Sequence, residues 1–315
     1  MKQFLTRRLV ICAATIAGAS FLIFAGLYLA PGDPISFLIG GRPSTPEMRE
    51  ALADQYHLND PFFQRYLQWL GDAFAGDFGE SIVRRRPVTE LIATSLPTTI
   101  LLVLMTLLLV VLIGVLLGGI AAFRRGPIDD GILSAMTVSL ATPVFVSAIL
   151  LISVFAVGLG WFPVFGPGTD FLDRLHHLVL PAIALTIAWW PVIGETARAS
   201  MREEHGREHV ETARSRGLSP SHIVRKHVFR NSAIPISTVV GLSFAGLVAG
   251  TAIVESAFQL NGLGSLLITS VTGRDFPVAQ AVALILVTVF AVTNVIVDLL
   301  YAALDPRVRT SWRTA

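Results

Sequence analysis

Residues 100–122 read ILLVLMTLLLVVLIGVLLGGIAA, a run of 23 residues without a charged side chain, and this run decides the fold class. A helix needs about 20 consecutive apolar residues to cross the hydrocarbon core of a membrane, at about 1.5 Å per residue. Backbone groups in lipid must be hydrogen-bonded within the protein, and a helix meets this need within one segment. A membrane β-barrel would instead show short segments that alternate at every second residue. The run therefore predicts a membrane-spanning helix.

Apolar stretches of similar length recur along the whole chain. They predict an all-α membrane protein with six spans, at about 9–30, 97–123, 132–157, 178–196, 234–254 and 278–304. The composition agrees, because 53% of the 315 residues are hydrophobic and 15% are charged, whereas a typical soluble domain has about 25% charged residues. Mean hydropathy is +0.67. These values, with a net charge of only +2, disfavour a soluble enzyme, a nucleic-acid-binding protein and a disordered chain.

The first apolar stretch has the basic start of a secretory signal peptide, with Lys2, Arg7 and Arg8. At about 22 residues it is longer than the roughly 7–15 apolar residues of a signal peptide, and no clear A-x-A cleavage site follows. We therefore expect an uncleaved span. Cys12, the one cysteine, lies within it and excludes both an intramolecular disulfide and a multi-cysteine zinc site.

The basic residues predict the orientation, because cytoplasmic loops of membrane proteins are enriched in lysine and arginine. Sixteen of the 24 lie in regions that six spans place on one side: the N-terminus, the loop that follows residue 123, residues 198–230 and the C-terminal tail. The two short loops on the other side carry one each, Arg174 and Arg274. Both termini are therefore expected in the cytoplasm.

The segment 31–96 is then extracytoplasmic, with six basic and nine acidic residues. The pairs Thr45-Pro46 and Asp60-Pro61 have the residue types that begin helices. They predict two short helices, through residue 56 and to about residue 74. Two compatible roles remain open, a cap that lies on the spans and a docking surface for a solute-binding partner.

Residues 198–230, hereafter the basic loop, carry eight basic and four acidic residues. Glutamates near the start of 203–216 and arginines near its end complement a helix dipole, so we expect one helix there. Gly217 follows as a left-handed cap, and Ser219-Pro220 begins a second helix. An amphipathic helix-turn-helix of this kind can lie on anionic lipid or insert into a groove of a cytoplasmic protein. The residues alone favour neither.

Three acidic residues lie within the spans, where charge is costly and commonly functional: Glu195, Glu255 and Asp298. Each is expected to reach the membrane interface or to pair with a neighbour, and Glu255 is also a candidate for the outer gate of a transport pathway. Small residues let helices approach closely. We expect such packing at Gly114, Gly118 and Gly119.

Enzymatic alternatives find little support. Ser243 would need a base within hydrogen-bond reach, and all seven histidines lie outside the expected spans. His205 and His209 are four residues apart, but no H-E-x-x-H motif and no G-x-x-x-x-G-K-[ST] phosphate loop is present. We therefore expect no catalytic, cofactor or metal site in this chain. A proton-driven secondary transporter is a weaker alternative, because no buried chain of acids and histidines is present.

The stretch 211–217, ETARSRG, resembles the E-A-A-x-x-x-G loop of permease subunits of ABC importers. Its surroundings, HVETARSRGLSPSHIVRKHVFRNSAIP, resemble the version found in dipeptide and oligopeptide importers, including the pair Arg230-Asn231 and Pro235, expected to open the next span. Further stretches resemble the B-type permease subunit of the dipeptide, oligopeptide and nickel family: LAPGDP (29–34), FFQRYLQW (62–69), GDFGES (76–81), RRRPVTELIATSLPTT (84–99) and LLYAALDPRVR (299–309). The likeness spans almost the whole chain.

The loop departs from the family pattern at three positions. Thr212 stands at the second position of the E-A-A triplet, His209 where the family often has an aromatic residue, and Glu211 where it often has a basic one. These departures place individual contacts in doubt more than the loop as a whole.

The resemblance implies the fold of a type I ABC importer permease. It divides the chain into an N-terminal span (1–30), an extracytoplasmic segment with short helices (31–94), a core of five spans (95–304) that includes the basic loop, and a cytoplasmic tail (305–315). It also implies a multi-pass protein of the bacterial plasma membrane, surrounded by lipid and without a nucleic-acid partner.

The resemblance further implies that the basic loop docks on a cytoplasmic ATPase. The residues assigned to this contact are Glu208, Glu211, Thr212, Ala213, Gly217 and Leu218. The implied partners are a second, related permease subunit in a heterodimer, two ATPase subunits that bind ATP and Mg²⁺, and an extracytoplasmic solute-binding protein. We favour di- or oligopeptides as the solute. Nickel complexes, glutathione or another small solute remain alternatives, because the binding protein makes most of the selection.

Overall fold

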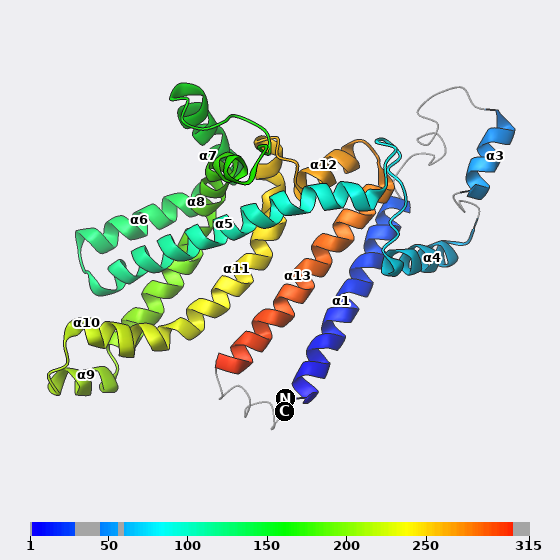
Figure 1. The fold of residues 1–315 in the computed structure, drawn as a ribbon. Coiled ribbons are helices and arrows are strands. Elements are labelled where there is room, and N and C mark those ends of the chain that lie inside the picture. Colours follow the sequence, from blue (N-terminus) through cyan, green and yellow to red (C-terminus); the bar gives the residue numbers. More distant parts are fainter. Residues whose placement is uncertain (1, 29–44, 56–59, 305–315) are drawn as a thin grey trace.

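The computed structural model describes residues 2–28, 45–55 and 60–304, and the regular elements in these ranges are helices (Figure 1). The long ones are α1 (Lys2–Tyr28), α5 (Val88–Phe123), α8 (Phe171–His205), α11 (Arg230–Ala257) and α13 (Phe276–Leu304). The shorter ones are α3 (Pro46–Gln55), α4 (Phe62–Ala75), α6 (Pro127–Ala141), α7 (Val144–Leu151), α9 (Glu208–Ser215), α10 (Pro220–Ile223) and α12 (Leu263–Thr272), with π-helical turns η1 (Ile152–Gly158) and η2 (Val224–Phe229). The LAPGDP stretch and the tail 305–315 lie outside the described residues.

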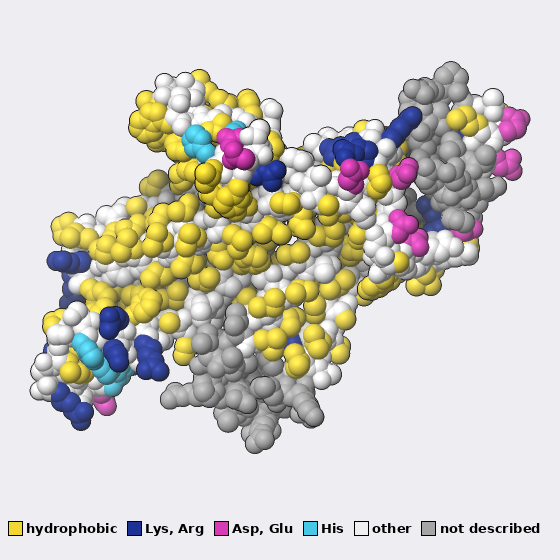
Figure 2. Space-filling model, viewed as in Figure 1, with side chains coloured by type: hydrophobic (Ala, Val, Ile, Leu, Met, Phe, Trp, Pro, Cys, Tyr) yellow, Lys and Arg dark blue, Asp and Glu magenta, His cyan; other side chains and the backbone are white. Residues whose placement is uncertain are grey.

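The long helices run side by side, and their ends form two polar faces. Figure 1 places α9, α10, the end of α5 and the start of α1 at one end, with α4 and α12 at the other. In Figure 2, Lys and Arg side chains gather over α9, α10 and the end of α5, whereas at the other end Asp and Glu side chains lie beside a second group of Lys and Arg side chains. Hydrophobic side chains cover most of the surface between them, as expected of a protein embedded in lipid.

Among the described residues, five helical segments are long and apolar enough to cross a membrane, at 5–26, 88–123, 171–205, 220–257 and 276–299. The span expected at 132–157 is not one straight helix, because α6 and the continuous pair α7–η1 meet at an angle of 99°. The bend falls at Thr142, which is extended at φ −88° and ψ 114°. Pro143 follows it, and a proline disfavours the helical conformation of the residue before it.

Several helices begin earlier than expected, and two of these differences involve proline. Spans were expected to begin at 97 and 234, but α5 begins at Val88 and α11 at Arg230, so Pro97 and Pro235 lie inside their helices. Proline removes one backbone donor, yet long membrane helices tolerate it when their surroundings satisfy the freed carbonyl. The expectation that proline begins a helix is therefore wrong for these two long helices, in which proline lies several residues inside.

Close packing of α5 against α8 forms much of the core. A Cβ atom added at Gly118 would lie 2.3 Å from the carbonyl oxygen of Gly194 in α8, which no side chain tolerates. One added at Gly114 would lie 3.0 Å from the Ile193 side chain and from the Trp190 carbonyl oxygen. The expected close approach at these two glycines is confirmed, and it follows from the absence of side chains at the contact.

The segment between the first two spans packs on α1 through aromatic rings of α4. Phe24 of α1 lies 5.4 to 5.6 Å, centroid to centroid, from Phe62, Tyr66 and Trp69 of α4. The Tyr66 and Ser20 hydroxyls are 2.8 Å apart. Aromatic pairs at these distances stabilise beyond the area that they bury. The first short helix begins at Pro46, as predicted, and the second begins at Phe62, one residue later than Pro61 indicated. The packing of α4 on α1 agrees with the expectation that this segment forms a cap lying on the spans.

Candidate functional site in the basic loop

The basic loop contains a short helix, α9, that stands apart from the long helix before it. The expected single helix over 203–216 is wrong, because α8 continues to His205 and α9 covers only Glu208–Ser215. Arg207 is extended between them, at φ −80° and ψ 151°. The sequence carries the signal for this break in Gly206, since glycine inside a helix costs about 1 kcal/mol relative to alanine.

The cap at the end of α9 is confirmed in detail. Gly217 has φ +76°, a left-handed conformation that glycine adopts without strain. Its N–H donates to the carbonyl of Arg214 at 3.0 Å, and the N–H of Leu218 donates to the carbonyl of Ala213 at 3.3 Å. These two bonds make a complete Schellman motif, which satisfies carbonyls that the end of a helix leaves free. The chain therefore turns sharply after α9.

One face of α9 is anchored to the body of the protein. Val210 and Ala213, one helical turn apart, are buried. They belong to a cluster with Met201 of α8, Ile223 of α10 and Val228 of η2. Burial of apolar side chains stabilises this contact, so α9 has a fixed position relative to the ends of α8 and α11.

A buried carboxylate joins three parts of the loop, and the sequence analysis did not identify it. Glu204, in the last turn of α8, is only 5% exposed. It accepts a hydrogen bond from the Asn231 amide at 2.8 Å and lies 3.1 Å from Nε of Arg207 and 3.3 Å from Nε2 of His209. Asn231 lies in α11, 27 residues along the chain. Glu204 thus connects α8, the start of α9 and the start of α11.

Arg207 also bonds to the exposed Glu203, at 2.8 Å. This hydrogen bond and the charge of Glu204 raise the pKa of Arg207 above its usual value. The guanidinium therefore keeps its charge at every physiological pH and holds the extended residue between α8 and α9 in place.

The residues assigned to ATPase docking divide between the two faces of this helix. Ala213 is buried on the side of α9 that packs against the rest of the chain. The other five are exposed: Glu208, Glu211, Thr212, Gly217 and Leu218. The exposed face carries carboxylates at its N-terminal end and Leu218 just after its C-terminal end. The face that α9 leaves accessible is therefore mainly polar, with one apolar side chain just after the helix.

A buried ion pair fixes α6 to α8 beside this loop. Arg198 holds the carboxylate of Asp129 with two bonds, of 2.7 and 2.8 Å, and Arg202 lies 3.4 Å from the same group. Two parallel bonds between arginine and a carboxylate give strength and a defined geometry. The two helices are therefore clamped at the end from which the basic loop begins.

The three acidic residues of the spans have different surroundings. Asp298 pairs with Arg8 at 2.9 Å, which joins α13 to α1 and confirms the expected pairing for this residue. Glu195 is exposed on α8. Glu255 is fully buried, and it accepts hydrogen bonds from Thr99 of α5 at 2.7 Å and from the backbone N–H of Ser265 in α12 at 2.9 Å. Its carboxylate thus fixes the start of α12.

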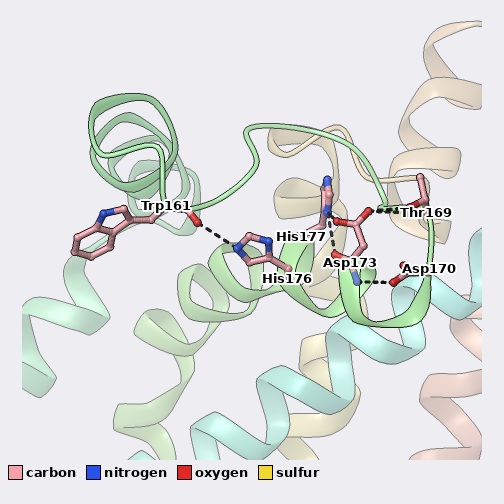
Figure 3. A network of polar contacts seen from close by, with 6 residues as sticks. All are labelled: Trp161, Thr169, Asp170, Asp173, His176 and His177. Carbon is pink, nitrogen blue, oxygen red and sulfur yellow. Dashed lines mark hydrogen bonds and ion pairs between the residues drawn. The ribbon is translucent and has the colours of Figure 1, made fainter.

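At the opposite end of the protein, the loop before α8 forms the polar network in Figure 3. Asp170 caps the helix by accepting from the N–H of Asp173 at 2.9 Å, and Asp173 accepts from the N–H of Thr169 at 2.8 Å. His176 donates to the carbonyl of Trp161 at 3.2 Å. The ring of Trp161 remains exposed, so a rigid loop presents an aromatic side chain at this surface.

The histidine pair of the basic loop is not assembled as a metal site. Nε2 of His205 lies 3.1 Å from a guanidinium nitrogen of Arg214, whereas Nε2 of His209 lies near Glu204. Within the ranges that the structure describes, no group of three or more histidine, cysteine and acidic side chains could hold a metal ion.

Comparison with known proteins gives matches over nearly the whole chain. Residues 113–310 match the family described as "Binding-protein-dependent transport system inner membrane component", and residues 1–103 match its N-terminal domain. The chain is 37% identical to the oligopeptide transport system permease protein AppB of Bacillus subtilis (strain 168), over 98% of this chain and 99% of that protein. It is 35% identical to the di/tripeptide transport system permease protein DppB of Pseudomonas aeruginosa (strain UCBPP-PA14), with the same coverage.

A further relative is the glutathione transport system permease protein GsiC of Escherichia coli (strain K12), 36% identical over 98% of this chain and 99% of that one. Among solved structures, the inward-facing MetNI methionine ABC transporter matches with a TM-score of 0.58 at 17% identity, over 68% of this chain and 96% of that one. A likeness at this identity shows the fold alone, and it places the helices described above in the arrangement of an ABC importer permease.

Proposed function

This chain belongs to the family of binding-protein-dependent transport system inner membrane components, and we propose that it forms half of the translocation pathway of an ATP-driven importer. The likeness to transport permeases over 98% of the chain carries this conclusion. The chain is thus a transport subunit, and we assign ATP and Mg²⁺ to separate ATPase subunits. A second related permease and an extracytoplasmic solute-binding protein complete the proposed complex.

We propose di- or oligopeptides as the solute, since two of the relatives are named as oligopeptide and di/tripeptide permeases. Glutathione is the named solute of a third relative of similar identity and remains an alternative. Nickel complexes or another small solute would use the same architecture. A secondary transporter is the distant alternative, and it differs in needing neither ATP nor a binding protein.

The proposed topology has six spans in a bacterial plasma membrane, with the bent pair α6 and α7–η1 as one of them and both termini in the cytoplasm. Two observations support it: α1 begins on the same side as α9 (Figure 1), and the basic side chains gather there (Figure 2). Cytoplasmic enrichment of such residues is general. The same proposal keeps the division into 1–30, 31–94, 95–304 and 305–315.

We propose that α9 is the coupling helix. Its exposed residues, Glu208, Glu211, Thr212, Gly217 and Leu218, dock on the ATPase, while Ala213 anchors the helix. Motion of the ATPase then reaches the spans through the buried side of α9. For the outer gate we propose an indirect role for Glu255, because its buried carboxylate holds α12 in place.

A pair of proline substitutions tests the coupling proposal. Gly217 and Gly76 both end a helix in the left-handed conformation, at φ +76° and +81°, and the N–H of each bonds to a carbonyl of its helix. Proline fixes φ near about −65° and removes that N–H. In proteoliposomes with the complete complex, Gly217→Pro should abolish ATP- and binding-protein-dependent uptake, whereas Gly76→Pro, at the end of α4, should retain it.

Both variants must be present in the membrane in wild-type amounts. Normal uptake by Gly217→Pro would contradict the assignment of α9 as the coupling helix. Uptake by the wild-type complex without ATP would instead support the secondary transporter.

A further inference from the structure

An apolar groove opens beside the basic loop, and the coupling role of α9 does not account for it. Its volume is about 490 Å³, within the range of about 300–1,000 Å³ that is usual for ligand pockets. Leu116, Gly119 and Ile120 of α5 form one wall, and Val224 and Phe229 of η2 form the other. A groove with these walls accommodates a hydrocarbon chain.

Two arginines also line this groove, and neither forms an ion pair within the part of the chain that the structure describes. Arg124 follows the last residue of α5, and Arg225 lies in η2. Within the described residues, no carboxylate forms an ion pair with either guanidinium. The groove therefore combines apolar walls with two cationic donors, which is the complement of an amphiphile that carries an anionic head.

The groove continues into an exposed apolar stripe along α5. Leu104, Leu108, Leu112, Leu116 and Ile120 recur at every fourth residue, and each side chain is exposed. Residues four apart are neighbours on a helix surface but advance by about 40° per step, so the stripe winds slowly around α5. The stripe runs from the middle of the span to the two arginines, so an apolar chain lying along it would bring its polar head to the end of α5.

We propose that this groove binds an anionic phospholipid of the cytoplasmic leaflet. The phosphate contacts Arg124 and Arg225, and an acyl chain lies against Leu116 and Ile120. The inference rests on the proposed orientation, which places this end of α5 at the cytoplasmic surface, where anionic lipids are enriched. A helix of the partner permease is the other candidate occupant. An apolar helix would leave both guanidiniums without a counter-charge, and unpaired charge in an apolar contact is costly.

Native mass spectrometry of the purified complex tests the proposal directly. The probes are phosphatidylglycerol and phosphatidylcholine with identical acyl chains, added in equal amounts. We expect phosphatidylglycerol to bind more tightly, and Arg124→Gln with Arg225→Gln to weaken it by about 30-fold, from about fivefold per arginine. Inorganic phosphate should not compete, because it lacks the acyl chain that fills the groove.

The matched control removes the same charge from the adjacent positions. Arg125 and Lys226 follow the two groove arginines in the chain but do not line the groove. Arg125→Gln with Lys226→Gln removes the same surface charge, so it should weaken the binding of both lipids less than the groove variant weakens phosphatidylglycerol, if direct contact in the groove and not the overall surface charge binds the lipid. Equal losses in the two double variants, or equal binding of both lipids, would overturn the proposal.

A third variant tests the groove without altering charge. A Cβ at Gly119 would meet only the Met201 sulfur, at 3.4 Å, so a larger side chain can enter the groove. Gly119→Leu should reduce phosphatidylglycerol binding while both arginines remain. A crosslink from Leu116→Cys to the partner permease in high yield would place a protein helix in the groove and would also overturn the proposal. Lipid binding is measured without transport, so its failure leaves the proposed import function intact.

Discussion

Replacing Glu204 by glutamine should loosen α9 without changing the size of the side chain. The carboxylate is 5% exposed and bonds to Arg207, His209 and Asn231. The glutamine amide is neutral, so it lacks the negative charge that holds Arg207. Its NH₂ group is a hydrogen-bond donor, and it would face groups that are themselves donors. Leaving buried polar groups without suitable partners costs about 1–3 kcal/mol each. For one such loss, the equilibrium for opening the loop shifts by about 5- to 150-fold.

Hydrogen–deuterium exchange of the purified complex measures this shift, because exchange of protected amides reports the free energy of local opening. Peptides that cover residues 206–218 should exchange faster in Glu204→Gln by that factor. Peptides from α12, at the opposite end of the protein (Figure 1), should keep their rate in the same sample.

The preceding residue provides the matched control. Glu203 also bonds to Arg207, but its side chain is 71% exposed. An exposed ion pair is worth about 0.2–1 kcal/mol, so Glu203→Gln should accelerate exchange by at most about fivefold and less than Glu204→Gln does. If both variants accelerate exchange equally, or if neither does, the buried carboxylate is not what fixes the loop.

Four further variants test the packing of the spans. Gly118→Ala should lower the melting temperature of the purified complex, since its Cβ would press on a backbone carbonyl and overpacking costs about 1–3 kcal/mol. Gly119→Ala should leave that temperature unchanged or raise it, because the added Cβ meets only a flexible methionine sulfur. Asp129→Asn should speed hydrogen exchange at the start of α6, and an unchanged rate would contradict the clamp between α6 and α8. Glu255→Gln should speed exchange in α12 more than in the basic loop, and the reverse order would contradict its local role.

The features that sequence predicts well here are those with local causes. The spans follow from apolar runs, and the cap at Gly217 follows from one residue type at the end of a helix. The glycines of α5 indicated close packing, although the sequence does not name their partners on α8. The exposed face of α9 was also found from the stretch 211–217, because the resemblance to a family supplied it.

The features that sequence could not predict depend on distant residues. Asp129 and Arg198 are 69 positions apart, and Ser81, which bonds to the buried Asp275, is 194 positions away from it. No local pattern relates such pairs. The bend at Pro143 is a different error, since its signal is present in the sequence but an apolar run on both sides of the proline hid it.

The contacts of α8 indicate how a force on the basic loop would reach the pathway. Its 35 residues extend about 50 Å, from the outer loop capped by Asp170 to Glu204 beside α9. Arg198 clamps this helix to α6, and the glycines of α5 lock it to the longest apolar span. The breaks in the chain, at Gly206 and Gly217, flank α9 rather than interrupt α8. Because α9 is short, anchored on one face and joined to α8 through Glu204, a displacement of α9 moves the end of α8. The packing therefore favours α8, with α5 and α6 fixed to it, as the unit that an ATPase would move in the proposed complex.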